Sequence, residues 1–422
     1  MLAGPDEKLT LYSVRIRQRY AIAFAMALSL CVGVLFERWV MFAGVPSEAS
    51  DQFILMSQAW KTIEHYYVDR GAIRPNSMAY GAINGMTESL GDTGHTMFLT
   101  PQQTKKADAA MQGKLTGVGI EIRARDRQTV VVAPIDGSPA QTAGIRAGDV
   151  ILEVDGLPVT GLSFPQIAGK ISGQAGQLVE LTVLNPRDGQ KRVIKIVRAA
   201  MKVNNVSWHR LPGTSLAHLR IAMFSEGASN DFRKALEEIQ KEGLAGIVLD
   251  LRNDPGGVLD EAVSIASQFL QSGYVLWEKD ANSIINPVPV RPGGIATNIP
   301  MAVLINGGSA SDSEIVAGAL RDAHRATLIG ETTFGTGTVL SEFDLNDGST
   351  LMLAVQEWLT PIKQSFWHRG IEPDIKIRLG PETSPLLPNA ERDMTESQMN
   401  TSSDTQLRMA IEVLTKQSKR GF

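Results

Sequence analysis

The chain has 422 residues, of which 43% are hydrophobic and 20% are charged. This is the composition of an ordinary globular protein with room for about three domains. The formal net charge of −4 provides no electrostatic basis for binding nucleic acid. The single cysteine, Cys31, excludes an intrachain disulfide, and the scattered histidines offer no metal-ligand spacing. We expect no metal and no other cofactor.

An uncharged, mostly apolar run at residues 20–36 is near the lower length limit for a helix that spans a bilayer. Three arginines lie just before it, which favours a cytoplasmic N-terminus. We predict a cytoplasmic segment at 1–19, a single transmembrane anchor at 20–42, and a main body outside the cytoplasm, in the periplasm or at the cell surface. A cleaved signal peptide is the alternative, although Glu37 and Arg38 make a poor cleavage site.

Apolar residues at helical spacing predict a small helical domain at residues 51–110, with helices near 53–67 and 79–90. A Gly-Asp-Thr-Gly-His run interrupts the pattern and predicts a loop at 91–101.

Residues 112–199 change to short β runs and glycine turns, which predict a compact β-rich module with two helices. The expected elements are β runs at 117–122, 129–132 and 147–156, helices at 138–144 and 164–171, and a hairpin at 179–197. The junctions near 111 and 200 have the composition of simple linkers.

Residues 200–380 alternate between strand and helix. The expected helices are 230–242, 260–271 and 311–323, and the expected strands are 246–251, 301–306, 326–330 and 350–355. Two of these strands are almost continuously apolar, as in parallel strands buried on both faces. The predicted class is therefore α/β within a multidomain chain. Residues 381–422 predict a flexible polar segment that ends in a helix at 404–416.

One serine stands where a strand, a glycine turn and a helix meet. The apolar run 301–306 is followed by two glycines, and Ser311 opens the next helix. A hydroxyl at a helix N-terminus lies near free backbone N–H groups that can stabilise an anion, which suits a nucleophile. The structural alternative is a capping box, because Ser311 and Glu314 have the Ser-x-x-Glu spacing.

The module at 112–199 resembles a PDZ domain over its full length. Gly117, Val118, Gly119 and Ile120 stand where such domains carry the loop that receives the terminal carboxylate of a peptide. The resemblance implies that backbone N–H groups of this loop bind the carboxylate and that the adjacent strand accepts an added peptide strand. A glycine-rich β module of another kind is the alternative.

Four further segments occur in one order along the α/β domain. They are Ile-Val-Leu-Asp-Leu-Arg-Asn-Asp-Pro-Gly-Gly at 247–257, Ser-Ala-Ser-Asp-Ser-Glu at 309–314, Gly-Glu-Thr-Thr-Phe-Gly at 330–335, and Gly-Ile-Glu-Pro-Asp at 370–374. Together with the order of the domains, they resemble the carboxyl-terminal processing peptidases, the tail-specific serine proteases of family S41. The resemblance covers residues 51–377.

The resemblance implies that Ser311 is the nucleophile. Gly256 and Gly257 end a strand, where their amides are candidate oxyanion donors, and a tight turn is the alternative. Asp322 also matches a family position, but eleven helical residues separate it from Ser311 by about 16 Å. We interpret Asp322 as structural.

The sequence departs from the family at Thr336, where the resemblance implies a lysine that acts as general base. Leu340 stands where a glutamine would orient that lysine. Threonine has no usable basicity near neutral pH, so another group must act as base or the protein is inactive. Lys363 and His368, which fall in one segment, are the preferred substitutes.

His95 and Asp312 are further candidates for the base, and each of the four candidates has an ordinary structural role as its alternative. Two functions follow from the sequence. The first is a membrane-anchored serine endopeptidase whose PDZ module binds the C-termini of protein substrates. The second is a catalytically silent family member that serves as a peptide-binding scaffold. The sequence indicates no oligomeric state.

Overall fold

The computed structural model describes residues 47–92, 96–111, 114–125, 128–162, 164–186, 188–202, 204–380, 383, 385–392 and 394–419. The predicted cytoplasmic segment, the predicted anchor at 20–42 and the candidate base His95 lie outside these ranges. Within them, no helix has the length and apolar character needed to cross a membrane. The chain forms two compact units, which divide between residues 78 and 79.

The first unit contains the helix α2 and the beginning of α3. Its elements are η1 (Ser47–Ala49), α2 (Ser50–Tyr66), η2 (Arg70–Ala72) and the first turn of α3 (Pro75–Ser89). Both predicted helices are present, and α3 begins earlier than expected because Pro75 suits the first turn of a helix. The predicted helical domain at 51–110 is divided, since residues from 79 onward belong to the second unit.

The predicted PDZ module is built on an antiparallel sheet with the order β3-β4-β5-β7-β8, and β6 pairs with β5. Its strands are β3 (Ile120–Arg125), β4 (Gln128–Pro134), β5 (Val150–Val154), β6 (Leu157–Pro158), β7 (Leu178–Leu184) and β8 (Lys191–Val197), and its helices are α5 (Pro139–Thr142) and α6 (Phe164–Ile171). The two predicted linkers instead pair with each other, as β2 (Lys114–Gly117) and β9 (Ala199–Lys202).

The α/β domain is organised by a six-stranded sheet with the order β10-β11-β12-β15-β16-β19. The strands are β10 (Val206–Arg210), β11 (Leu216–Ile221), β12 (Gly246–Asp250), β15 (Met301–Ile305), β16 (Thr327–Gly330) and β19 (Ile375–Lys376), and the helices are α7 (Ala228–Lys241), α8 (Leu259–Ala266), α9 (Asp312–Asp322) and α12 (Thr405–Lys419). All pairs except β10 with β11 are parallel, which confirms the predicted class.

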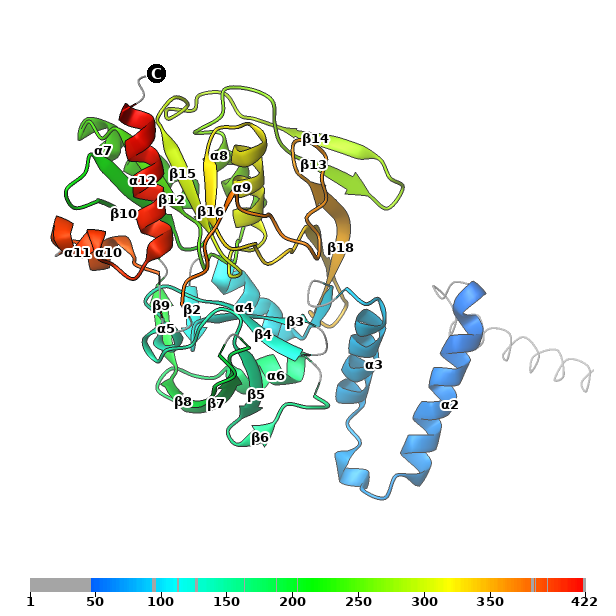
Figure 1. Ribbon diagram of the computed structural model, residues 1–422. Coiled ribbons are helices and arrows are strands. Elements are labelled where there is room, and N and C mark those ends of the chain that lie inside the picture. The colour runs from blue at the N-terminus through cyan, green and yellow to red at the C-terminus, as the bar shows by residue number, and fades with distance from the viewer. Residues whose placement is uncertain are drawn as a thin grey trace, which may run out of the picture. The chain divides into compact units, whose positions relative to one another are not determined.

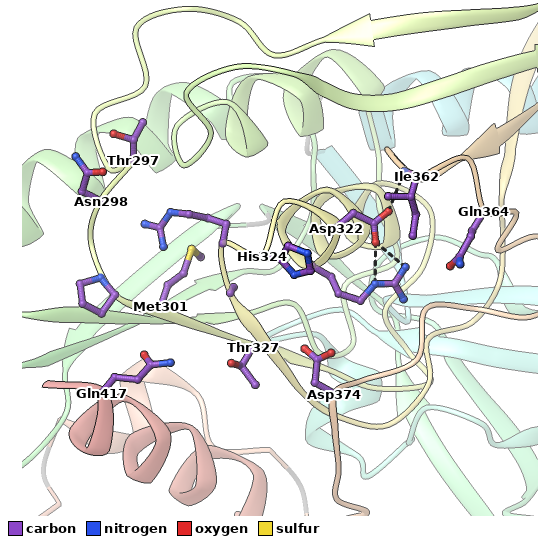
Figure 2. Close-up of a pocket in the computed structure, with 14 residues that line it drawn as sticks. Thr297, Asn298, Met301, Asp322, His324, Thr327, Ile362, Gln364, Asp374 and Gln417 are labelled. Atoms are coloured by element: carbon purple, nitrogen blue, oxygen red, sulfur yellow. Dashed lines mark hydrogen bonds and ion pairs between the residues drawn. The ribbon is translucent and has the colours of Figure 1, made fainter. Parts of the chain in front are cut away.

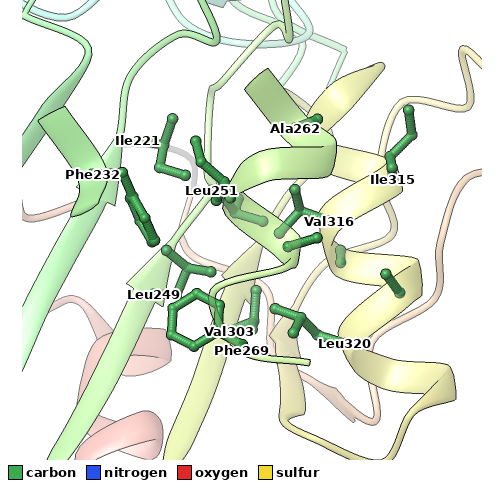
Figure 3. Packing of buried hydrophobic residues seen from close by; sticks show 14 of the residues in the cluster. Ile221, Phe232, Leu249, Leu251, Ala262, Phe269, Val303, Ile315, Val316 and Leu320 are labelled. Atoms are coloured by element: carbon green, nitrogen blue, oxygen red, sulfur yellow. The ribbon is translucent and has the colours of Figure 1, made fainter. Parts of the chain in front are cut away.

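The central strands are buried on both faces, as their apolar runs predicted. On one face, Leu249 and Val303 pack with Phe232, Val316 and neighbouring residues of the helices α7, α8 and α9 (Figure 3). On the opposite face, α12 lies across β12 and β15 (Figure 1). Alternate residues of each strand therefore face different helices, and no strand position is left for a polar surface.

A second sheet was not expected from the sequence. It has the order β1-β18-β13-β14, with β17 also paired to β18. Its strands are β1 (Met97–Leu99), β13 (Tyr274–Asp280), β14 (Ile285–Pro289), β17 (Thr338–Asp344) and β18 (Thr350–Leu359). The strand β1 lies in the predicted loop at 91–101, and the helix α4 (Pro101–Met111) follows it directly.

The C-terminal part of the chain corrects the prediction of a flexible segment. Its described residues include α10 (Pro388–Glu391) and α11 (Glu396–Asn400), and three polar side chains in it, Glu391, Asp404 and Gln406, are fully buried. Asp404 accepts hydrogen bonds from the Arg252 guanidinium at 2.9 Å. The segment is held against the sheet by these ionic contacts and by the buried apolar face of α12. The terminal helix itself is confirmed.

Candidate active site

Three loops meet at one edge of the parallel sheet. They follow β12, β15 and β16, which are neighbours in the sheet and run in the same direction. Because parallel strands end at the same edge, the loops carry Gly256 and Gly257, Ser311, and Thr336 to one place. The sheet topology thus brings together the segments that the sequence analysis singled out.

Ser311 has a strained backbone conformation, with φ 55° and ψ −115°, directly before α9. Positive φ is unusual for a residue with a side chain and costs about 1–3 kcal/mol, so the surrounding structure must impose it. Ser311 is half-buried, whereas every other residue from 308 to 320 is buried. The predicted capping box is present as well. Capping and partial exposure of Ser311 are therefore compatible, although this φ is not that of an ordinary N-cap.

The loops after β12 and β15 are joined by direct hydrogen bonds. The Asn253 N–H donates to Asn306 Oδ1 at 2.9 Å, and Asn306 Nδ2 donates to Asn253 Oδ1 at 2.8 Å. The Ser309 hydroxyl donates to the Leu251 carbonyl oxygen at 2.7 Å. These bonds fix both sides of the turn that presents Ser311.

The Glu314 carboxylate joins Ser311 to the loop after β16. Its Oε2 accepts from the N–H groups of Ser311 at 3.0 Å and Thr336 at 2.8 Å. Its Oε1 accepts from the Thr333 hydroxyl at 2.5 Å and from the Gly335 N–H at 2.7 Å. Burial raises the pKa of Glu314 to about 7, and these four hydrogen bonds act in the opposite direction.

Thr336 is nearly fully buried, and its N–H is committed to Glu314. Its side chain is a hydroxyl, so the position where the family resemblance implies a lysine base contains no group that titrates near neutral pH. Thr336 therefore lies in the site, but its hydroxyl cannot act as a general base near neutral pH.

Gly256 and Gly257 form the wall of the site beside Ser311. A Cβ on Gly256 would lie 2.6 Å from the Ser311 Cβ, and its φ is 98°, so only glycine fits there. The Gly256 N–H already donates to Asp254 Oδ1 at 3.0 Å. The turn and the close approach account for Gly256, and its role as an oxyanion donor stays a prediction.

The two preferred substitute bases lie in the turn and loop after β18. Lys363 is exposed, and its Nζ lies 4.3 Å from the centre of the Trp277 ring, within the range of a cation–π contact. His368 is exposed and stacks on Trp367, and its N–H donates to the Gly335 carbonyl oxygen at 2.9 Å. The backbone of His368 is therefore bonded to Gly335, the residue that precedes Thr336. A catalytic role for either side chain stays a prediction.

Asp322 lies at the other end of α9 and accepts hydrogen bonds from Arg321 at 3.0 and 2.9 Å. It lines a hollow of about 940 Å³ with His324 and Asp374 (Figure 2). Met301 and Thr327, the first residues of β15 and β16, also line this hollow. The hollow is therefore at the amino edge of the sheet, opposite Ser311, which agrees with a structural role for Asp322.

The predicted carboxylate-binding loop of the PDZ module leads into β3, which is an edge strand. Val118 is buried, and its carbonyl oxygen accepts from the Ala140 N–H at 2.9 Å. Gly119 has φ 78°, and a Cβ there would lie 2.3 Å from the Ser138 Cβ. The loop is thus fixed against α5, and the outer edge of β3 has no partner among the described strands.

Comparisons with known proteins agree with this architecture. The family model for peptidase family S41 matches residues 215–377, and a PDZ domain model matches residues 130–185. A carboxyl-terminal-processing protease of Picosynechococcus is 32% identical over 387 residues, which is 87% of this chain and 90% of that protein. The carboxy-terminal processing protease CtpA of Bacillus subtilis is 31% identical over 333 residues, which is 79% of this chain and 70% of that protein.

A solved structure of a photosystem II D1 C-terminal processing protease has a TM-score of 0.66 and 30% sequence identity. The match covers 79% of this chain and 94% of that one. The chain therefore belongs to peptidase family S41, among the carboxyl-terminal-processing serine proteases with a PDZ domain. The family consists of hydrolases, and the resemblance inferred from the sequence is confirmed.

Sequence reasoning missed two features of the site. Glu314 was recognised only as a capping residue, because its contacts with the loop after β16 are invisible in local spacing. Asp254, in the Asn-Asp-Pro-Gly-Gly turn, is fully buried, and its carbonyl oxygen accepts from the Ala310 N–H at 3.0 Å, next to Ser311. A charged residue next to a predicted glycine turn was the available signal, although most such residues face solvent.

We predict that Glu314→Gln loosens the site. Glutamine offers one carbonyl oxygen and one NH₂ group, so two of the four donors around Glu314 lose their acceptor. Two unsatisfied buried donors lower the free energy of unfolding by about 2–4 kcal/mol. Urea unfolding followed by tryptophan fluorescence measures this change.

The matched control is Glu342→Gln, the same substitution at an exposed position of β17. It should alter the free energy of unfolding by no more than about 0.5 kcal/mol. Equal urea midpoints for the two variants would contradict the role assigned to Glu314.

Proposed function

We propose that this protein is an active endopeptidase that cleaves polypeptides after its PDZ module has bound their C-termini. The observation that supports this most is the setting of Ser311. Its side chain is partly exposed although the start of α9 around it is buried, and its backbone has a positive φ. A strained turn at the N-terminus of a helix is a mounting that suits a nucleophilic hydroxyl. Glu314 and the glycine wall fix that mounting from two sides.

In the proposed reaction, Ser311 Oγ attacks the carbonyl carbon of the scissile peptide bond and gives its proton to a base. The N–H groups of Gly257 and of Asp312, at the start of α9, are the proposed donors to the oxyanion. Collapse of the tetrahedral intermediate releases the amine product and leaves an acyl group on Ser311. Water then attacks this ester and gives a proton to the same base. The base returns the proton to Ser311 Oγ as the acid product leaves.

The PDZ module supports the capture of substrate C-termini. The outer edge of β3 can accept an extended peptide as an additional strand, and the loop from Gly117 to Ile120 stands at the start of that strand. Main-chain hydrogen bonds would supply affinity, and the loop amides would bind the terminal carboxylate. The α6 helix contacts β3 and would form the other side of the groove.

Thr336 favours the second candidate, a peptide-binding scaffold, because the position of the expected base has no basic group. The two candidates differ in one outcome, peptide hydrolysis that depends on Ser311. Both require the PDZ module to bind peptide C-termini.

We predict that residues 45–422 cleave an unstructured protein that ends in small apolar residues. Ser311→Ala should abolish this cleavage, since it removes the nucleophile without enlarging the side chain. Product masses identify the cleaved bonds. If neither protein cleaves and both bind the C-terminal peptide equally, the scaffold is correct and the endopeptidase is not.

We predict that Gly119→Ala weakens substrate capture. The added methyl group would clash with Ser138 and the residue would be strained at φ 78°, so the loop must shift. The expected result is a rise of KM by about tenfold or more with a smaller change in kcat. Gly85→Ala in α3, where a Cβ meets no atom within 4 Å, is the control and should leave KM unchanged.

A membrane anchor at residues 20–42, with an N-terminus in the cytoplasm and the catalytic domain outside it, is also proposed, from the sequence alone. Alkaline carbonate should leave the full chain in the membrane pellet and release a form without residues 1–44. Release of the full chain would show that the anchor is absent.

A further inference from the structure

Two buried carboxyl groups stand beside Ser311, those of Asp254 and Asp312, and their residues are 0% and 1% exposed. Asp254 Oδ2 and both carboxylate oxygens of Asp312 have no hydrogen-bond partner of normal geometry among the described residues. Burying a carboxylate without partners is costly, so such groups require an explanation. A purely structural aspartate would be expected to have its oxygens paired.

Both carboxyl groups are located along the two-glycine wall that Ser311 contacts. Asp254 Oδ1 accepts from the Gly256 N–H at 3.0 Å, and the site of a Gly256 Cβ is 2.6 Å from the Ser311 Cβ. The next amide, that of Gly257, acts on the Asp312 carboxyl. Since consecutive Cα atoms are about 3.8 Å apart, the hydroxyl-bearing carbon and the two carboxyl groups surround one short stretch of chain.

Burial and the charged groups around this pair favour a single negative charge on the two carboxyl groups. Burial raises the pKa of Asp312 to about 7, and the amides of Gly257 and Asp312 oppose this only in part. Burial also raises the pKa of Asp254 well above its usual range, and the negative charge of Asp312 adds to this effect. Arg220 acts on Asp254 in the opposite sense, but its guanidinium also donates to Asp136 and to the Arg252 carbonyl oxygen.

Glu314, one turn along α9, is a third buried carboxyl group. Among the described residues, Arg220 is the cation that acts on Asp254, and it is shared with Asp136. Asp312 therefore ionises first, near neutral pH, while Asp254 keeps its proton. A carboxylate that gains and loses its proton near pH 7 is matched to accepting a proton from a nucleophile under physiological conditions. The lysine that the family resemblance implies would have the same property for a different reason, desolvation of an amine.

We propose that the Asp312 carboxylate is the general base for Ser311, with Asp254 as a protonated positioning residue beside it. This inference rests on the proposed endopeptidase function. As the Ser311 Oγ–H bond breaks, the proton moves to Asp312, the Oγ–C bond forms, and the carbonyl electron pair moves to oxygen. When the C–N bond breaks, the proton passes from Asp312 to the leaving nitrogen.

This assignment also resolves a conflict of charge. The amides of Gly257 and Asp312 face the Asp312 carboxyl, and they are also the proposed oxyanion donors. Two negative charges at the same amides would repel each other. Proton transfer neutralises Asp312 at the moment the oxyanion forms, so the negative charge moves from the carboxylate to the oxyanion and the two do not coexist.

The test compares the full chain with Asp312→Asn, which keeps the shape of the side chain and removes its basicity. For the unsubstituted protein, kcat should rise with pH through a midpoint near 7. Asp312→Asn should lower kcat by about 100-fold or more, with little change in KM, and remove that rise. Added formate should restore part of the activity of Asp312→Ala, because it replaces the lost carboxylate.

Asp322→Asn is the control, since it is the same substitution at a buried position at the other end of α9. It should keep the midpoint of the pH profile, whatever its effect on stability. Infrared difference spectra between pH 6 and 8 give a second measurement. Two carboxyl signals should titrate in the unsubstituted protein, those of Asp312 and Glu314, and only the signal of Glu314 should remain in Asp312→Asn.

The inference alone is overturned if the unsubstituted protein cleaves and Asp312→Asn keeps both its kcat and its pH profile. Variants of Lys363, His368 and His95 would then identify the base. If the unsubstituted protein cleaves at no pH, the proposed function and the inference both fail. The two failures are therefore distinguishable.

Discussion

The Glu314 carboxylate is the interaction on which the candidate active site depends. One buried side chain accepts from the backbone of Ser311 and from three groups of the loop after β16. Those hydrogen bonds tie the start of α9 to a loop that has no other regular structure at this point. One backbone bond, from the Phe334 N–H to the Ser309 carbonyl oxygen at 2.9 Å, joins the same two loops nearby. Glu314 is the group that binds the backbone N–H groups of both Ser311 and Thr336, so the position of this carboxylate helps to fix the geometry of the nucleophile.

The sheet behind this site is supported by a buried ionic network as well as by its apolar core. Burial alone would lower the pKa of His218, but the carboxylates of Glu391 and Asp250 raise it to about 9. Asp250 also accepts from Arg252, which donates in turn to Asp404. The network links β11 and β12 to the C-terminal segment. Its members come from parts of the chain far apart in sequence, so the site loop after β12 depends on the chain's last helix being in place.

Local patterns predicted the parts of the fold that are determined by local physics. The apolar runs at 246–251 and 301–306 identified strands buried on both faces, and helical spacing placed α7, α9 and α12 within a few residues. The strand predicted at 350–355 is part of β18, but it was expected in the parallel sheet. The second sheet was missed because β1 has only three residues and pairs with β18 across more than 250 residues. The C-terminal segment was predicted to be flexible because its polar residues find their ionic partners only in the folded sheet.

The same distinction applies to the site. Ser311 and the two glycines could be found because strand, turn and helix signals surround them in sequence. Asp312 was only one of four candidates for the base, and the contacts of Glu314 and Asp254 could not be found, since burial is a property of the folded chain. Thr336 was recognisable only against a family pattern. The structure adds to that observation two buried carboxyl groups, of which Asp312 and one oxygen of Asp254 lack hydrogen-bond partners of normal geometry among the described residues.

The central claim is that Ser311 is an activated nucleophile in a site without the expected lysine. The most direct measurement is incubation of the protein with a fluorophosphonate, followed by peptide mapping in a mass spectrometer. The account predicts a single adduct on Ser311, formed faster at pH 8 than at pH 6. An unmodified Ser311 after prolonged incubation at both pH values would contradict it.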